Sequence, residues 1–159
     1  MKAVTNSSAL AVLLCAVMAL SACSEPLSSD TFVRNSQRDA LGMYSFDLDM
    51  SDSTYVYDMD LYTRFDGSVR KIRNVGNIPL KIRVYDAEGN CYEEQSCLTA
   101  SSSASSGAFS RYCRVPYRHG CVPKNFGLWK IQIETPGPES AGMTGLGLIV
   151  TKRRWEKTN

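Results

Sequence analysis

Apolar and polar side chains alternate along several short stretches of the chain. These stretches cover residues 44–50, 55–62, 80–84, 129–133 and 146–150, and residues 91–98 and 112–117 are expected to form two further short strands. Alternation with a period of two is typical of strands that bury one face and expose the other. No stretch beyond residue 43 repeats apolar residues at helical spacing. The pattern therefore predicts an antiparallel β-sandwich of about seven strands.

Polar segments between the predicted strands indicate how the chain turns. Residues 51–53 (Ser-Asp-Ser) are expected to join the first two strands in a hairpin, and residues 86–90 (Asp-Ala-Glu-Gly-Asn) the third and fourth. The serine-rich segment 99–110 has almost no large apolar side chain, so we expect an exposed loop there. Residues 24–39 are polar and lack periodicity, which is typical of a tether.

The N-terminal segment has the pattern of a secretory signal. Lys2 gives it a positive start, and residues 9–20 are uniformly apolar but too few to span a bilayer. Residues 20–23 (Leu-Ser-Ala-Cys) are similar to the bacterial lipobox, whose cysteine is acylated, with palmitate for example, and becomes the first mature residue. The expected domains are a signal peptide over 1–22, a lipidated tether over 23–42 and a β-sandwich over 43–159.

A lipid on Cys23 would hold the protein on a membrane outside the cytoplasm. Ser24 follows this cysteine, in place of the aspartate that typically retains bacterial lipoproteins in the inner membrane. We therefore expect the protein at the outer membrane. The sequence leaves open whether it occupies the periplasmic or the cell-surface face.

Composition limits the body of the protein to one nearly neutral domain. Removal of the signal leaves 137 of the 159 residues, a length that supports a single core. The whole chain has 18 basic and 16 acidic residues, so loss of Lys2 with the signal leaves a net charge of +1. This balance argues against a nucleic-acid partner.

Once Cys15 leaves with the signal and Cys23 takes lipid, the remaining cysteines are Cys91, Cys97, Cys113 and Cys121. In an exported domain, four cysteines form two disulfides more often than a metal site. Zinc is disfavoured because His119 is the only histidine and no Cys-x-x-Cys spacing occurs. Pairing of Cys91 with Cys97 and of Cys113 with Cys121 is the favoured interpretation. A bridge from Cys97 to Cys113 remains open.

Acidic residues on the first two predicted strands are the best candidates for a metal site: Asp47, Asp49, Asp58 and Asp60. A hairpin of these strands would bring the carboxylates together, and a calcium ion would then relieve their repulsion. Two solvent-facing surfaces in offset register are the favoured alternative. His119 is expected in a turn without a nucleophilic partner. The sequence therefore predicts no enzyme and no cofactor, and the calcium ion remains the alternative interpretation of these aspartates.

Aromatic side chains divide into core and surface candidates. Trp129 alternates in phase with Ile131 and Ile133, so we expect it in the core. The tyrosines on polar faces or near loops are Tyr62, Tyr85, Tyr112 and Tyr117. Amphipathic rings in such positions stack on sugars or contact protein partners. The preference of tyrosine for strands is the simpler explanation.

The segments 57–64, 78–84, 126–134 and 143–150, with the turn at 86–90, resemble the gliding-motility lipoprotein H (GldH) family of the Bacteroidetes. The resemblance implies a lipoprotein with a β-sandwich body. It also implies a non-catalytic accessory component of gliding or secretion machinery that docks to envelope proteins. The chain departs from the family in the middle, where it has serines and cysteines in place of a glycine-rich segment with aspartates. A surface glycan-binding or adhesive lipoprotein is the alternative.

Overall fold

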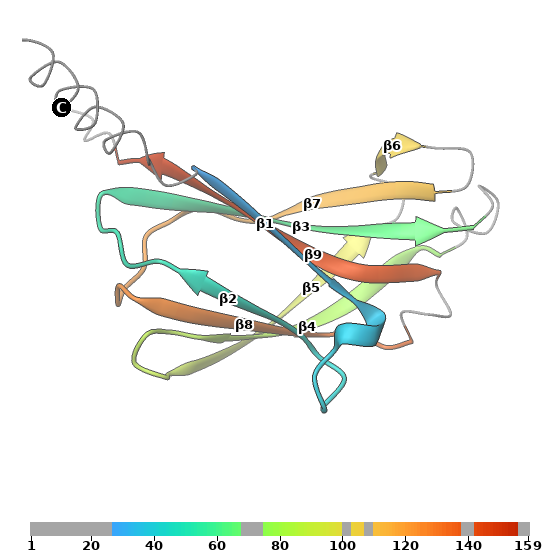
Figure 1. Cartoon of the computed structure of the whole chain (residues 1–159), viewed down its shortest axis with the longest axis horizontal. Helices are drawn as coiled ribbons and strands as arrows, with labels where there is room; N and C mark the ends of the chain where they lie inside the picture. The colour runs from blue at the N-terminus through green and yellow to red at the C-terminus, as the bar shows by residue number, and fades with distance from the viewer. Residues whose placement is uncertain (1–26, 68–74, 100–102, 107–109, 138–141, 156–159) are drawn as a thin grey trace, which may run out of the picture.

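The computed structural model describes residues 27–67, 75–99, 103–106, 110–137 and 142–155. The predicted signal peptide and Cys23 lie outside the described residues. Within these ranges the chain forms nine strands and one 3-10 turn, arranged in two layers (Figure 1). The elements are β1 (Ser28–Arg34), η1 (Asn35–Gln37), β2 (Tyr44–Asp49), β3 (Tyr55–Asp66), β4 (Asn77–Tyr85), β5 (Cys91–Thr99), β6 (Ser103–Ser106), β7 (Ser110–Cys121), β8 (Leu128–Glu134) and β9 (Met143–Arg154).

One layer, which we call sheet A, has the strand order β1-β9-β3-β7-β6, and the other, sheet B, has the order β2-β8-β4-β5. Every strand pairing in both sheets is antiparallel. The predicted β-sandwich is confirmed, and each of the stretches that alternate in the sequence forms a strand. Among the described residues, no helix combines the length and apolar composition needed to cross a bilayer.

Two strands were not predicted. Strand β1 lies inside the segment expected to be a tether, and β6 lies inside the serine-rich segment expected to be a loop. Each is at an edge of sheet A and pairs with a single neighbour. Backbone hydrogen bonds to that neighbour define such a strand, so its side chains need not alternate. The structure therefore corrects both predictions.

The predicted hairpins have different outcomes. Strands β4 and β5 pair from Tyr85 and Cys91 at the turn to Asn77 and Thr99, as predicted. The hairpin predicted for β2 and β3 is wrong, because β2 pairs with β8 and β3 pairs with β7 and β9. The turn after β2 carries the chain from sheet B to sheet A. Alternation shows which face of a strand is buried, and it does not identify the neighbouring strand.

The core lies between the sheets and is built from the inward residues of both layers. The largest fully buried side chains are Tyr44, Phe46, Met50, Tyr57, Met59, Leu61, Phe65, Leu80, Ile82, Leu98 and Ile131. Trp129 is 7% exposed and belongs to the same cluster, so its predicted place in the core is confirmed. Its indole Nε1 donates a hydrogen bond to the carbonyl of Asn125 at 2.8 Å.

Candidate functional site

The outer face of sheet A carries stacked aromatic rings beside paired charged side chains. Strand register sets out this face: Phe32 of β1 lies opposite Gly147 of β9, and Gly147 lies opposite Tyr62 of β3. Arg114 of β7 lies opposite Tyr62 on its other side. Four adjacent strands therefore contribute to one row across the sheet.

Three aromatic rings lie next to one another on this face. The Phe32 and Tyr62 ring centroids are 5.6 Å apart with planes inclined by 28°, and those of Tyr62 and Tyr112 are 6.1 Å apart with planes inclined by 20°. Both pairs are stacked, an arrangement that aromatic quadrupoles favour. We call Phe32, Tyr62 and Tyr112 the aromatic row. Tyr62 at its centre is 8% exposed, whereas Tyr112 at its end is 46% exposed.

Two glycines of β9 create the space in which these rings lie. A Cβ atom on Gly147 would be 2.2 Å from Cζ of the Tyr62 ring, and a Cβ atom on Gly145 would be 2.7 Å from Cζ of Phe32. Real Cβ atoms do not approach other atoms so closely. The rings therefore lie directly over the backbone of β9, where any other residue would lift them from the sheet.

The hydroxyl group of Tyr62 fixes the centre of the row. It donates a hydrogen bond to Oδ1 of Asp30 at 2.6 Å. Burial raises the pKa of Tyr62 well above its usual value, and the bond to Asp30 raises it further. The phenol thus stays protonated as a donor, and Tyr62 is tied to β1 by both its ring and its hydroxyl.

Charged residues beside the row are paired. Asp60 accepts hydrogen bonds from Arg114 Nε at 3.0 Å and from His119 Nε2 at 3.0 Å. Burial alone would raise the pKa of Asp60, but the bonds from His119 and Arg114 outweigh it and leave the pKa below its usual value. Asp58 is held ionised in the same way: a hydrogen bond from Arg153 is the largest cause of its lowered pKa. The face thus presents fixed ionised groups at ordinary pH.

The four aspartates predicted as a calcium site are not brought together. Asp47 and Asp49 lie on β2 of sheet B, and Asp58 and Asp60 lie on β3 of sheet A. The two strands are not neighbours, so the hairpin that would have assembled the site does not form. Among the described residues, no group of three or more histidine, cysteine, aspartate or glutamate side chains is arranged to hold a metal ion.

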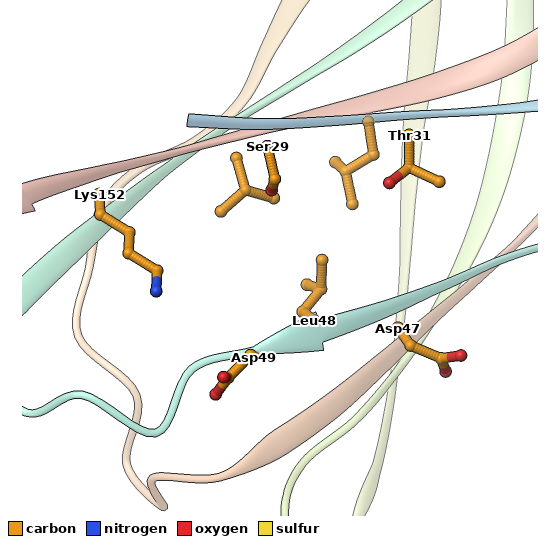
Figure 2. Close-up of a pocket in the computed structure, with 8 residues that line it drawn as sticks. Ser29, Thr31, Asp47, Leu48, Asp49 and Lys152 are labelled. Atoms are coloured by element: carbon orange, nitrogen blue, oxygen red, sulfur yellow. The ribbon is translucent and has the colours of Figure 1, made fainter. Parts of the chain in front are cut away.

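A groove of about 390 Å³ opens between the edge strands β1 and β2. It is lined by Ser29, Thr31, Asp47, Leu48, Asp49, Leu148, Val150 and Lys152. Figure 2 shows Ser29 and Thr31 on the β1 side and Leu48 on the β2 side, with Lys152 at one end. None of the lining residues is aromatic, so the groove lacks the stacking surface of the aromatic row.

Of the four tyrosines proposed from the sequence, the structure brings two together. Tyr62 and Tyr112 belong to the aromatic row, whereas Tyr85 is half-buried on β4 of the other sheet. The Tyr117 hydroxyl donates a hydrogen bond to Glu94 of β5, and its ring packs against the core. Sequence reasoning missed Phe32, because it falls in the segment taken as a tether. Gly145 and Gly147 alternate with leucines in the sequence, so one face of this strand has no side chains at these positions. This pattern indicates space that rings from neighbouring strands can cover.

The predicted disulfides do not form. Cys91 and Cys97 lie on one strand, as do Cys113 and Cys121, and six residues of extended strand span about 20 Å. A disulfide requires Cα atoms within about 7 Å, so the favoured pairing is wrong. The alternative bridge from Cys97 to Cys113 is also not formed: Cys97 is exposed and Cys113 is buried, with its thiol directed to the carbonyl of Thr99 at 3.1 Å.

Comparison with known proteins identifies no family. No protein-family model matches the sequence, and no curated protein matches it, so the resemblance to the GldH family stays a prediction.

A solved protein of Sulfurospirillum deleyianum is 11% identical, with a TM-score of 0.37, over 82% of this chain and 99% of that one. A non-crystalline-cellulose-specific carbohydrate-binding module of family 28 is 9% identical, with a TM-score of 0.36, over 81% of this chain and 73% of that one. A family-35 carbohydrate-binding module from Cellvibrio japonicus is 12% identical, with a TM-score of 0.31, over 82% of this chain and all 100% of that one. Similarity at this level carries no inference about function.

Proposed function

We propose that the protein is a non-catalytic, lipid-anchored carbohydrate-binding protein of the outer membrane, with the aromatic row as its binding surface. The observation that carries this proposal is the placement of the rings of Phe32 and Tyr62 directly over Gly145 and Gly147. This arrangement places two adjacent rings directly against the backbone of β9 on the outer face of sheet A. It also leaves Tyr112 exposed at the end of the row.

A pyranose ring has the complementary chemistry. Its axial C–H groups form an apolar face that stacks on an aromatic ring, and its hydroxyl groups accept and donate hydrogen bonds at the rim. Tyr112 supplies the exposed ring, and Arg114, two residues away on β7, supplies donors together with its hydrogen-bond acceptor Asp60 on β3. Because these charged groups are already paired, they are held in place before a ligand arrives.

Replacement of Tyr112 by alanine is expected to weaken glycan binding by about tenfold, which corresponds to about 1.4 kcal/mol. The physical reason is the loss of the one well-exposed ring of the row. Purified protein would first be screened on an array of neutral oligosaccharides, and the retained ligand would then be titrated by calorimetry. Tyr112→Phe keeps the ring and should keep most of the affinity.

The matched control is Tyr92→Ala. Tyr92 on β5 of sheet B is 47% exposed, close to the 46% of Tyr112, but it is not part of the aromatic row. Its replacement should leave glycan affinity unchanged. Equal losses in the two variants, or an array that retains no glycan, would contradict carbohydrate binding by this face.

The membrane anchor is a separate part of the proposal and rests on the lipobox-like residues 20–23. We expect Cys23→Ala to abolish labelling by radioactive palmitate and to move the protein out of the membrane fraction, because Cys23 is the acceptor of the lipid. Cys15→Ala, in the apolar part of the signal, should leave both palmitate labelling and the membrane fractionation of the protein unchanged. Labelling that persists without Cys23 would refute the anchor without affecting the glycan proposal.

A further inference from the structure

Strand β5 forms an open edge of sheet B. In the described part of the chain it pairs only with β4, so the backbone groups on its other side have no strand partner. Such an edge is a template for pairing with another strand. Two exposed cysteines, Cys91 and Cys97, lie at positions of equal parity along it, on the face opposite to buried Leu98.

Among the described residues, neither of these two thiols is bonded to another cysteine. Cys91 and Cys97 are separated by about 20 Å of extended strand, well beyond disulfide range. Cys113 is part of the core, and Cys121 packs against it from β7. Cys91 and Cys97 face away from that core. Cys15 and Cys23 lie outside the described residues, and the signal and the lipid are expected to remove them as partners. We therefore consider a thiol of a second chain as the partner at each position.

We propose that two copies of the chain pair antiparallel through their β5 strands and are joined by two disulfides, each from Cys91 of one copy to Cys97 of the other. Glu94 lies midway between the two cysteines. A two-fold axis at Glu94 places Cys91 of each copy opposite Cys97 of the other copy. Residues directly opposite in an antiparallel pair have Cα atoms about 4.5–5.5 Å apart, which is within the range of a disulfide.

Electrostatics are compatible with this register. Glu94 meets its own counterpart at the axis, but each Glu94 is neutralised by Arg118 of its own chain at 2.9 Å. Glu93 faces the uncharged Gln95 and is held by Arg83 at 2.9 Å. No bare like charges are therefore brought together by the pairing.

The covalent step is a thiol–disulfide exchange with a small disulfide oxidant such as oxidised glutathione. The thiolate of Cys91 attacks the oxidant, forms a mixed disulfide and releases one reduced thiolate. The thiolate of Cys97 from the second copy then attacks the Cys91 sulfur, forms the S–S bond and releases the second thiolate. Each bridge gives up two electrons and two protons, so a dimer with two bridges consumes two molecules of oxidant.

The test uses the full chain in detergent, treated with oxidised glutathione and separated without reductant. We expect a covalent dimer whose linked peptides join Cys91 to Cys97. Cys91→Ser or Cys97→Ser alone should abolish the dimer, because each lacks one member of both bridges. Mixing the two single variants should restore it, because Cys97 of the first can still meet Cys91 of the second.

Several outcomes would overturn the proposal. Bridges from Cys91 to Cys91 and from Cys97 to Cys97 would let each single variant form a dimer by itself. Random contact would give linked peptides for Cys91–Cys91, Cys97–Cys97 and Cys91–Cys97 alike. Bridges from Cys91 or Cys97 to Cys113 or Cys121 would appear as linked peptides in a monomer. Cys113→Ser and Cys121→Ser should leave the dimer band unchanged, and a loss of the band in either variant would also contradict the register.

Discussion

Replacing Trp129 by alanine is expected to lower the free energy of unfolding by about 3–5 kcal/mol, the usual cost of deleting a large aromatic side chain from a core. Trp129 is 7% exposed, lies opposite Leu48 of β2 and anchors its indole N–H on Asn125. Its removal would leave a cavity in the core beside Leu48 and an unpaired carbonyl at Asn125. Denaturant unfolding followed by far-ultraviolet circular dichroism measures the loss.

The control for this substitution is the preceding residue on the same strand. Leu128 is 73% exposed, so Leu128→Ala removes apolar atoms that the fold does not bury. Its unfolding free energy should stay within about 0.5 kcal/mol of the parent value. If both variants lost the same unfolding free energy, the loss would reflect the lower strand propensity of alanine in β8 and not the burial of the indole.

Gly147→Ala is the second substitution with a large expected effect, about 1–3 kcal/mol of destabilisation. The added methyl group would overlap the Tyr62 ring, with its carbon 2.1 Å from Cε1. That ring cannot move aside freely, because Phe32 and Tyr112 flank it and Asp30 holds its hydroxyl. The same denaturant titration measures the change, and glycan affinity should fall with it.

A second background shows whether the clash is the cause. In Tyr62→Ala the ring is absent, so adding Gly147→Ala should cost clearly less than it does in the parent chain, and the difference is the coupling energy. Thr151→Ala, on the same face of β9, should be nearly neutral. Equal costs of Gly147→Ala in both backgrounds would show that strand propensity, and not ring packing, requires glycine.

The alternation of side chains was sufficient to predict the layers of the fold but not the pairing within them. Residues such as Phe46, Leu61 and Ile131 face the core because their strands bury one side, and this property is local. Which strands are neighbours depends on contacts between distant segments. The aspartates of β2 and β3 were therefore assigned to the correct strands and to the wrong arrangement.

The candidate site could be predicted only in part, for related reasons. Tyr62 and Tyr112 fall on polar faces of predicted strands or near loops, so they were proposed from the sequence as contact aromatics. Phe32 is on an edge strand whose side chains are mostly exposed, and no periodic pattern marks it. The alternation of Gly145 and Gly147 with leucines indicates a face that rings could cover, but it does not identify Tyr62 of the neighbouring strand as the ring over Gly147.

Strand β1 gives the aromatic row a mechanical property. Phe32 is on the strand that follows the N-terminal segment, and β9 is its only strand neighbour among the described residues (Figure 1). A pull on the N-terminal segment therefore loads the β1–β9 hydrogen bonds before it loads the rest of sheet A. Because Phe32 and Asp30 both hold Tyr62, tension at this end of the chain is transmitted to the centre of the aromatic row. A ligand that bridges Phe32 and Tyr112 would resist the separation of β1 from the rest of sheet A. Bound ligand would therefore raise the force needed to detach β1, and tension on β1 would weaken ligand binding.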